Sequence, residues 1–231
     1  DLRHGEHVPI APSPDSSRQQ PGGDQHRPQR QERDHEHQPA SEPRTHSNSW
    51  GSTEATYSVE TMQTDDFMWT HPDFLIFFAA GNQGPAASTI GQPATAKNIV
   101  TVGGTENGLA DPNSMGYFSS HGPAPFGRMN PTITAPGDRL TSVLNGDPCG
   151  TTEKTGTSMA TPTVQGITLL MRQYLWDGYY PSGAANPADS LHPSAALLKA
   201  LLINSGRPMS GAHTDNATGG SWPSNGQGWG R

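Results

Sequence analysis

The chain has 231 residues, a formal net charge of −7, 27 Gly, 22 Pro and only 31% hydrophobic residues. This length suits one domain with a core of its own, and a negative charge without any run of Lys or Arg argues against nucleic acid or an anionic membrane as partner. No stretch approaches the ~20 apolar residues of a membrane span, and the single cysteine, Cys149, excludes an intrachain disulfide.

The first segment, residues 1–44, is poor in apolar side chains. Its few aliphatic residues are scattered among Gln, Arg, Asp, Glu, His and Pro, and they are Leu2, Val8, Ile10, Ala11 and Ala40. Such a composition buries too little surface to offset the entropy lost on ordering the chain. We therefore predict a disordered or aberrant segment over 1–44 and a globular part over 45–231.

The globular part opens with a pattern that predicts one helix and then two strands. Apolar residues recur with roughly helical spacing over 57–71, before a His-Pro pair that ends the helix. They are Val59, Met62, Phe67 and Trp69. The apolar runs 74–78 and 99–102 are too short for helices and lead into glycines, which indicates strands buried on both faces.

The second half of the chain continues this alternation. Residues 132–134 and 140–144 are weaker strand candidates. A helix begins near Thr161-Pro162, since proline in a first turn loses no needed hydrogen bond, and another runs over about 193–205. The first of these has an apolar stripe of Val164, Ile167, Leu170, Met171 and Tyr174. Strands alternating with helices predict an α/β domain with a mainly parallel sheet flanked by helices.

Ser158 lies in GTSMA, at the start of the predicted helix. A serine in that place is most often an N-cap, whose oxygen accepts from free backbone N–H groups. As a nucleophile it would gain from the same place, because a helix N-terminus suits the anion formed in acyl transfer. Asn82 follows a buried strand, where a turn residue is the ordinary interpretation and an amide projecting toward a cleft is the functional one. The pair indicates acyl transfer more strongly than either residue alone.

Six segments match landmarks of one family, in that family's order. They are HSNSWG (46–51), FFAAGNQGP (77–85), NIVTVGGTEN (98–107), FSSHGP (118–123), TAPG (134–137) and GTSMATP (156–162). Together they resemble the subtilases, the subtilisin-like serine peptidases, over residues 45–231, and the C-terminal part resembles the branch of large alkaline subtilases. The resemblance implies a subtilisin-like fold and a secreted, monomeric endopeptidase that acts on polypeptides.

The resemblance also assigns roles to individual residues. Ser158 would attack the scissile carbonyl, and the amide of Asn82 with the backbone N–H of Ser158 would stabilise the oxyanion. The backbone of Ser49, Trp50 and Gly51 would offer edges to an extended peptide. Small residues would wall the first specificity pocket, namely Ala79, Ala80 and Gly81.

The base and the acid that the family uses are poorly represented. HGEHV resembles the family's histidine motif HGTHVAG, and by that resemblance His4 is the base, although a solvated histidine in a tail is the alternative. The triad aspartate should lie some tens of residues earlier, yet only three residues precede His4. The resemblance therefore implies an N-terminally incomplete domain with early strands missing and little or no activity. The rest of 9–44 matches no family landmark, which motivates the hypothesis of a wrong frame or splice.

Two other functions were weighed against the peptidase. A catalytically inactive, peptide-binding relic stays open, because the aspartate is missing. An esterase-type hydrolase is disfavoured, because its nucleophile elbow is G-x-S-x-G and this chain has G-T-S-M-A. Catalysis needs no cofactor; structural calcium is compatible with the resemblance, but no loop motif defines a metal site. Cys149 has no evident thiolate activator and is expected to be a small buried residue.

Overall fold

A four-stranded parallel sheet in the order β1-β2-β3-β4 carries the fold. The computed structural model describes residues 43–108, 111–215 and 220–231, which all lie in one unit, Ser41–Arg231. Except for Pro43 and Arg44, the predicted segment 1–44 lies outside the described residues. The strands are β1 (Thr45–Asn48), β2 (Leu75–Ala79), β3 (Val100–Thr105) and β4 (Ile133–Pro136). The predicted α/β class and parallel sheet are confirmed.

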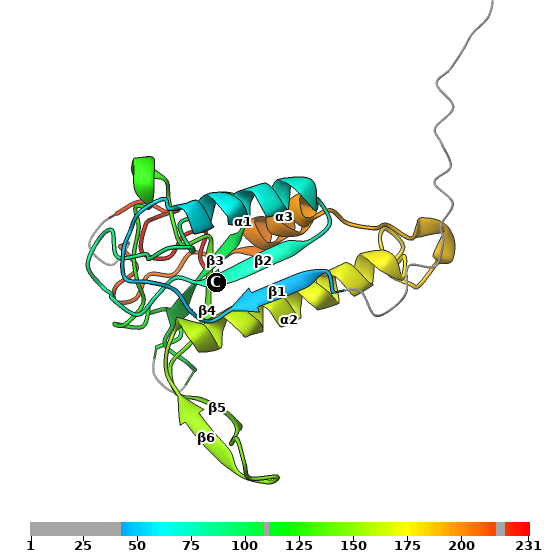
Figure 1. Cartoon of the computed structure of the whole chain (residues 1–231). Helices are drawn as coiled ribbons and strands as arrows, with labels where there is room; N and C mark the ends of the chain where they lie inside the picture. Colours follow the sequence, from blue (N-terminus) through cyan, green and yellow to red (C-terminus); the bar gives the residue numbers. More distant parts are fainter. Residues whose placement is uncertain (1–42, 109–110, 216–219) are drawn as a thin grey trace, which may run out of the picture. The chain divides into compact units, whose positions relative to one another are not determined.

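Three helices cover the two faces of the sheet. Helices α1 (Val59–Thr70) and α3 (Ala195–Ser205) lie on one face, and α2 (Thr157–Trp176) lies on the other (Figure 1). Two short 3₁₀ turns, η1 (Pro125–Gly127) and η2 (Pro187–Asp189), lie in the connections. The core lies between these layers, where the apolar runs of β2 and β3 are almost fully buried, as strands covered on both sides should be.

Helix α1 is confirmed, but its buried face is not its apolar one. The four apolar residues that revealed its spacing are exposed, whereas Thr61, Asp65 and Met68 are buried. The carboxylate of Asp65 accepts hydrogen bonds from the backbone N–H groups of Lys97 and Asn98 and from the hydroxyl of Tyr57. These three donors satisfy the buried carboxylate, so a polar anchor fixes how α1 faces the sheet.

Helix α2 begins at Thr157, four residues earlier than predicted, so Pro162 lies inside the helix. Of the predicted apolar stripe, Val164 is buried and Met171 packs against the core. The other three members are exposed, and they are Ile167, Leu170 and Tyr174. The sheet instead meets small and hydroxyl side chains of α2, which allow the helix to approach the strands closely. No helix in the described ranges is long and apolar enough to cross a membrane.

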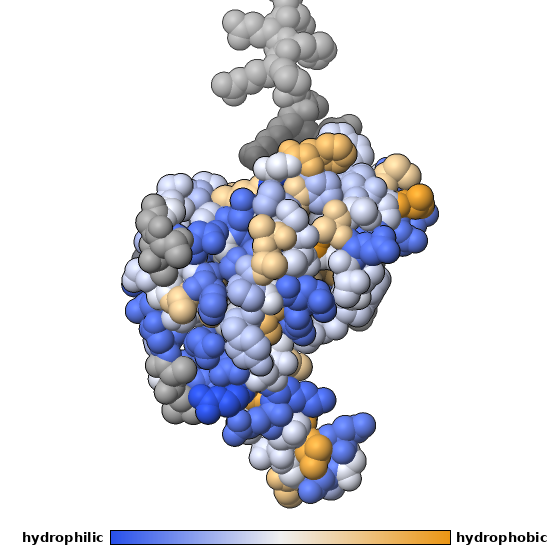
Figure 2. All heavy atoms as spheres, turned by 90° about the vertical axis from the view of Figure 1, so that its left-hand side faces the viewer, coloured by the Kyte–Doolittle hydropathy of each residue, from blue (hydrophilic) through white to orange (hydrophobic). Residues whose placement is uncertain are grey.

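The predicted strand 140–144 forms, but it does not join the parallel sheet. Strand β5 (Leu140–Val143) pairs antiparallel with β6 (Thr151–Lys154) in a hairpin that leads into α2. The hairpin stands clear of the rest of the unit (Figures 1 and 2). Cys149 lies in the turn of this hairpin and is exposed, so the expectation of a buried cysteine is wrong. Among the described residues, the hairpin packs against no core that could bury the cysteine.

The two edges of the sheet differ. The outer edge of β4 is covered by the C-terminal segment, since Thr134 N–H donates to the Gly230 carbonyl at 2.8 Å and Trp229 N–H donates to the Thr132 carbonyl at 3.1 Å. Within the described ranges, no backbone hydrogen bond covers the outer edge of β1. Strand β1 is thus the first strand of this sheet, and its carboxyl end is open to one side.

Candidate active site

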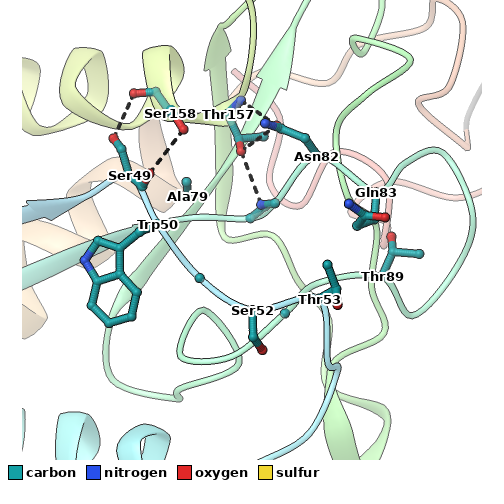
Figure 3. Close-up of a pocket in the computed structure, with 14 residues that line it drawn as sticks. Ser49, Trp50, Ser52, Thr53, Ala79, Asn82, Gln83, Thr89, Thr157 and Ser158 are labelled. Atoms are coloured by element: carbon teal, nitrogen blue, oxygen red, sulfur yellow. Dashed lines mark hydrogen bonds between the residues drawn. The ribbon is translucent and has the colours of Figure 1, made fainter.

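The carboxyl ends of β1 and β2 and the start of α2 surround a pocket of about 220 Å³ (Figure 3). In parallel α/β sheets, ligands bind outside the carboxyl ends of the strands. The pocket is lined by Ser49, Trp50, Gly51, Ser52, Thr53, Ala79, Ala80, Gly81, Asn82, Gln83, Thr89, Gly91, Thr157 and Ser158. All eight predicted site residues within the described ranges are among them. His4, the predicted base, lies outside the described residues.

Ser158 is the second residue of α2 and does not cap it. The N-cap is Gly156, which makes no side-chain capping bond, so the capping interpretation of Ser158 is wrong. Gly156 has φ +150°, and a Cβ there would lie 3.0 Å from the amide nitrogen of Asn82. A glycine is therefore required at this turn. The hydroxyl of Ser158 donates to the carbonyl of Ser49 at 3.4 Å, a long and weak hydrogen bond.

The side chain of Asn82 is held by the first residue of α2. Its carbonyl oxygen accepts from the backbone N–H and from the hydroxyl of Thr157, both at 3.0 Å. This pairing turns Oδ1 toward the helix start, and Nδ2 is the end of the amide that remains to donate. An amide nitrogen and free helix N–H groups beside a serine hydroxyl are the donors that an oxyanion needs.

Thr157 is a site residue that the sequence analysis did not single out. Its side chain is fully buried, and its hydroxyl also accepts from the backbone N–H of Gly81 at 3.2 Å. One hydroxyl therefore connects the end of β2, the side chain of Asn82 and the helix that carries Ser158. The available signal was its place directly before Ser158 in the GTS motif.

Gly91 closes the far end of the pocket and was also missed. The segment after β1 runs beside it, with Ser52 N–H donating to the Gln92 carbonyl at 2.8 Å and Gln92 N–H donating to the Glu54 carbonyl at 3.0 Å. A Cβ on Gly91 would lie 1.6 Å from the carbonyl oxygen of Ser52. Only glycine permits this close approach, and Gly91 itself lines the pocket.

Trp50 forms the rim on the side of β1. Its ring is 62% exposed, stands edge-on to Phe78 at 5.3 Å between ring centroids, and donates its indole N–H to the side-chain oxygen of Asn48 at 3.1 Å. An indole that is fixed at one edge and exposed over its face is suited to contact an apolar part of a bound peptide.

The described residues that line the pocket include no ionisable side chain. None of its lining residues carries an Asp, Glu, His, Lys or Arg side chain. The buried His121 has a pKa lowered mainly by desolvation, but it does not line the pocket. Within the described ranges, Ser158 has donors for an oxyanion beside it and no base.

The described ranges also contain no group of three or more His, Cys, Asp or Glu side chains placed to hold a metal ion. The calcium that the resemblance allows therefore has no residue set among them and stays a prediction. The buried carboxylate of Asp65 accepts the backbone hydrogen bonds that orient α1.

Comparison with known proteins agrees with this geometry. A sequence model of the subtilase family matches residues 19–230. The match begins inside 1–44, so it extends further toward the N-terminus than the resemblance over 45–231, but it does not include the HGEHV motif that contains His4. Sphericase, a solved structure, superposes with a TM-score of 0.61 over 80% of this chain and 55% of its own, at 24% identity, which supports the fold.

Two relatives are similar to this chain in sequence. The serine protease/ABC transporter B family protein tagD of Dictyostelium discoideum is 31% identical over 74% of this chain and 14% of its own length. The serine protease AprX of Bacillus subtilis is 33% identical over 43% of this chain and 26% of its own. The chain thus spans a small part of the length of these relatives.

Proposed function

Because the chain belongs to the subtilase family, we propose that it supplies the nucleophile, the oxyanion donors and the peptide groove of a serine endopeptidase. One observation carries this proposal: the hydroxyl of Ser158 and the amide of Asn82, from separate segments of the chain, line the same pocket. A serine that only capped α2 would need no oriented amide beside it.

In the proposed reaction, Oγ of Ser158 attacks the scissile carbonyl of a peptide and passes its proton to a base. The carbonyl oxygen gains the negative charge and accepts from Nδ2 of Asn82 and from the backbone N–H of Ser158. Collapse of this intermediate releases the amine and leaves an acyl-enzyme, which water then hydrolyses. We propose His4 as the base, on the strength of its motif alone.

The substrate is an extended polypeptide. Ser49, Trp50 and Gly51 follow an open-edged strand, so their backbone groups are placed to pair with a peptide as an added strand. The pocket beside them has small walls, and none of the described residues that line it is charged. We therefore expect an uncharged side chain before the scissile bond, since a buried charge there would have no partner.

Further properties rest on the family alone. We propose an extracellular, monomeric enzyme that needs no cofactor for the chemical step, with calcium, where it binds, serving stability. Neither nucleic acid nor a membrane surface is expected to be a partner of this acidic chain.

A second candidate function is a peptide-binding relic without catalysis. The absence of a base among the described lining residues favours it, because a groove without a base binds a peptide without activating Ser158. Retention of an oriented Asn82 favours the enzyme, because peptide binding alone makes no use of an oxyanion donor.

A fluorophosphonate probe separates the two functions. The probe phosphonylates only an activated serine, whose oxygen displaces fluoride from phosphorus, and intact-mass spectrometry counts the adducts. We expect a slow adduct on the chain that Ser158→Ala abolishes. An adduct that persists in Ser158→Ala contradicts the assignment of the nucleophile. Complete absence of an adduct, with peptide binding retained, establishes the relic.

A further inference from the structure

The carbonyl of Ser158 lacks its normal partner inside α2. In an α-helix the N–H of residue i+4 donates to the carbonyl of residue i, and for Ser158 that residue is Pro162, which lies inside the helix. Proline has no N–H, and its ring presses on the carbonyl four residues earlier. The carbonyl of the nucleophile residue therefore receives no helical hydrogen bond from position 162.

The hydroxyl of Ser49 takes the place of the missing helical donor. Its hydroxyl donates to the carbonyl of Ser158 at 2.9 Å, and its own carbonyl accepts from the hydroxyl of Ser158 at 3.4 Å. Figure 3 shows the two residues facing each other across the mouth of the pocket. Ser49 follows β1 directly, so these bonds join the proposed peptide-binding segment to the nucleophile.

We infer that Ser49 is a positioning residue for Ser158, and that Pro162 makes this possible because it has no N–H to donate to the carbonyl of Ser158. The inference rests on the proposed function for its catalytic consequence. A peptide that pairs with residues 49–51 also orders the hydroxyl that holds the backbone of the nucleophile. Peptide binding and alignment of Ser158 are thereby coupled.

The location of the bond argues against a purely structural role. Ser49 is exposed, so water is able to replace its hydroxyl on the carbonyl at little cost in stability. Water fixes no direction, however, whereas a side chain that directly follows β1 does. In a site where a misplacement of about 1 Å costs about 10²-fold in rate, direction is what this bond contributes.

A double-mutant cycle tests the coupling through the rate of fluorophosphonate labelling at Ser158. We expect Ser49→Ala to slow labelling by about 2- to 10-fold, the value of one hydrogen bond, and Ser49→Thr, which keeps the hydroxyl, to restore most of the rate. In a Pro162→Ala background the new N–H supplies the missing donor, and Ser49→Ala then changes the rate by less than about 2-fold.

A matched control uses another hydroxyl on the same turn. The hydroxyl of Thr163 donates to the Met159 carbonyl at 3.2 Å, a bond that Pro162 does not affect. Thr163→Ala should therefore have the same effect in both backgrounds. Equal effects of Ser49→Ala in the two backgrounds overturn the inference.

Thermal unfolding of the same variants decides the matter without catalysis. We expect Ser49→Ala to lower the midpoint by on the order of 2 °C with Pro162 present and by less with Ala in its place. If no variant is labelled, the proposed function fails, but the thermal-unfolding cycle still tests the coupling between Ser49 and Pro162. Additive midpoint shifts reject the coupling between Ser49 and Pro162 whatever the labelling shows.

Discussion

The two halves of the candidate site differ in what the described residues supply. On the oxyanion side, Asn82 is held by two bonds from Thr157, and Thr157 is held in turn by Gly81. On the proton-transfer side, the lining has no ionisable group, and the hydroxyl of Ser158 rests on a backbone carbonyl. Charge stabilisation is thus built into strand and helix ends, whereas general-base catalysis must come from other groups.

The largest expected effect comes from removing the oxyanion donor, the side-chain amide of Asn82. Asn82→Leu removes the side-chain N–H, and we expect labelling of Ser158 to slow by about 10²- to 10³-fold, a range that was established on subtilisin itself. The exposed Asn204 on α3 provides the control, since Asn204→Leu removes an amide far from the site. A loss of less than about 3-fold for Asn82→Leu would show that its amide does not contact the oxyanion.

The pocket wall should be the next most sensitive part. Gly91→Ala places a methyl group 1.6 Å from the Ser52 carbonyl oxygen in the present backbone, so the wall has to move. We expect the probe concentration for half-maximal labelling to rise by about 10-fold or more, while the rate at saturation changes less. Gly108→Ala is the matched control, because its Cβ meets nothing within 4 Å. Equal behaviour of the two variants would remove Gly91 from the pocket.

Thr157 tests the oxyanion half in another way, because it orients the amide of Asn82 without itself donating to the oxyanion. Thr157→Val keeps the shape of the side chain and the backbone N–H that holds Asn82, but it loses the hydroxyl. We expect labelling to slow by about 10-fold, near the value of one buried hydrogen bond. Thr157→Ser should stay close to the unchanged chain. The idea fails if Val and Ser at this position give the same rate.

The smallest expected effect concerns the stability of the scaffold rather than the candidate site. Desolvation on α3 lowers the pKa of Lys199 from 10.5 to about 8, and its ammonium donates to the carbonyls of Lys97 and Ile99. Between pH about 8 and 10.5 the unfolded chain binds more protons than the folded chain. The free energy of unfolding therefore rises with pH through this window, and the penalty is fully present below it.

Thermal melts at several pH values check this assignment. We expect the midpoint to rise by a few °C, on the scale of about 2–4 °C per kcal/mol, when the pH goes from 8 to 10. Lys199→Met should remove most of this rise, and the exposed Lys154→Met should leave it in place. A rise that survives Lys199→Met assigns the titration to another group.

Local pattern together with the resemblance to the subtilases was enough to predict which residues at element ends line the pocket. Ser158 and Asn82 each sit where an apolar run meets a glycine, and such ends converge at one edge of a parallel sheet. Thr157 and Gly91 were missed because their roles depend on Asn82 and Ser52, which are distant in sequence. Nothing in a lone threonine or glycine reveals a neighbour of that kind.

The fold shows the same limit. The apolar runs of β2 and β3 were enough to predict their burial, because a strand that is covered on both faces is apolar on both faces. The buried face of α1 was not predictable from its spacing, since the donors for Asp65 come from residues 97 and 98. The polar strand β6, with the sequence TTEK, has no apolar alternation, and only its partner β5 gives it a place.

Chemical rescue of Ser158 by imidazole tests most directly whether the described residues form a working oxyanion half that lacks a base. Neutral imidazole acts as a general base, so we predict that labelling of Ser158 in a His4→Ala variant, which lacks the proposed base, is slow alone and rises with imidazole concentration. Asn82→Leu should lower every point of that curve. Absence of labelling at all imidazole concentrations, or fast labelling that imidazole does not change, would contradict the account.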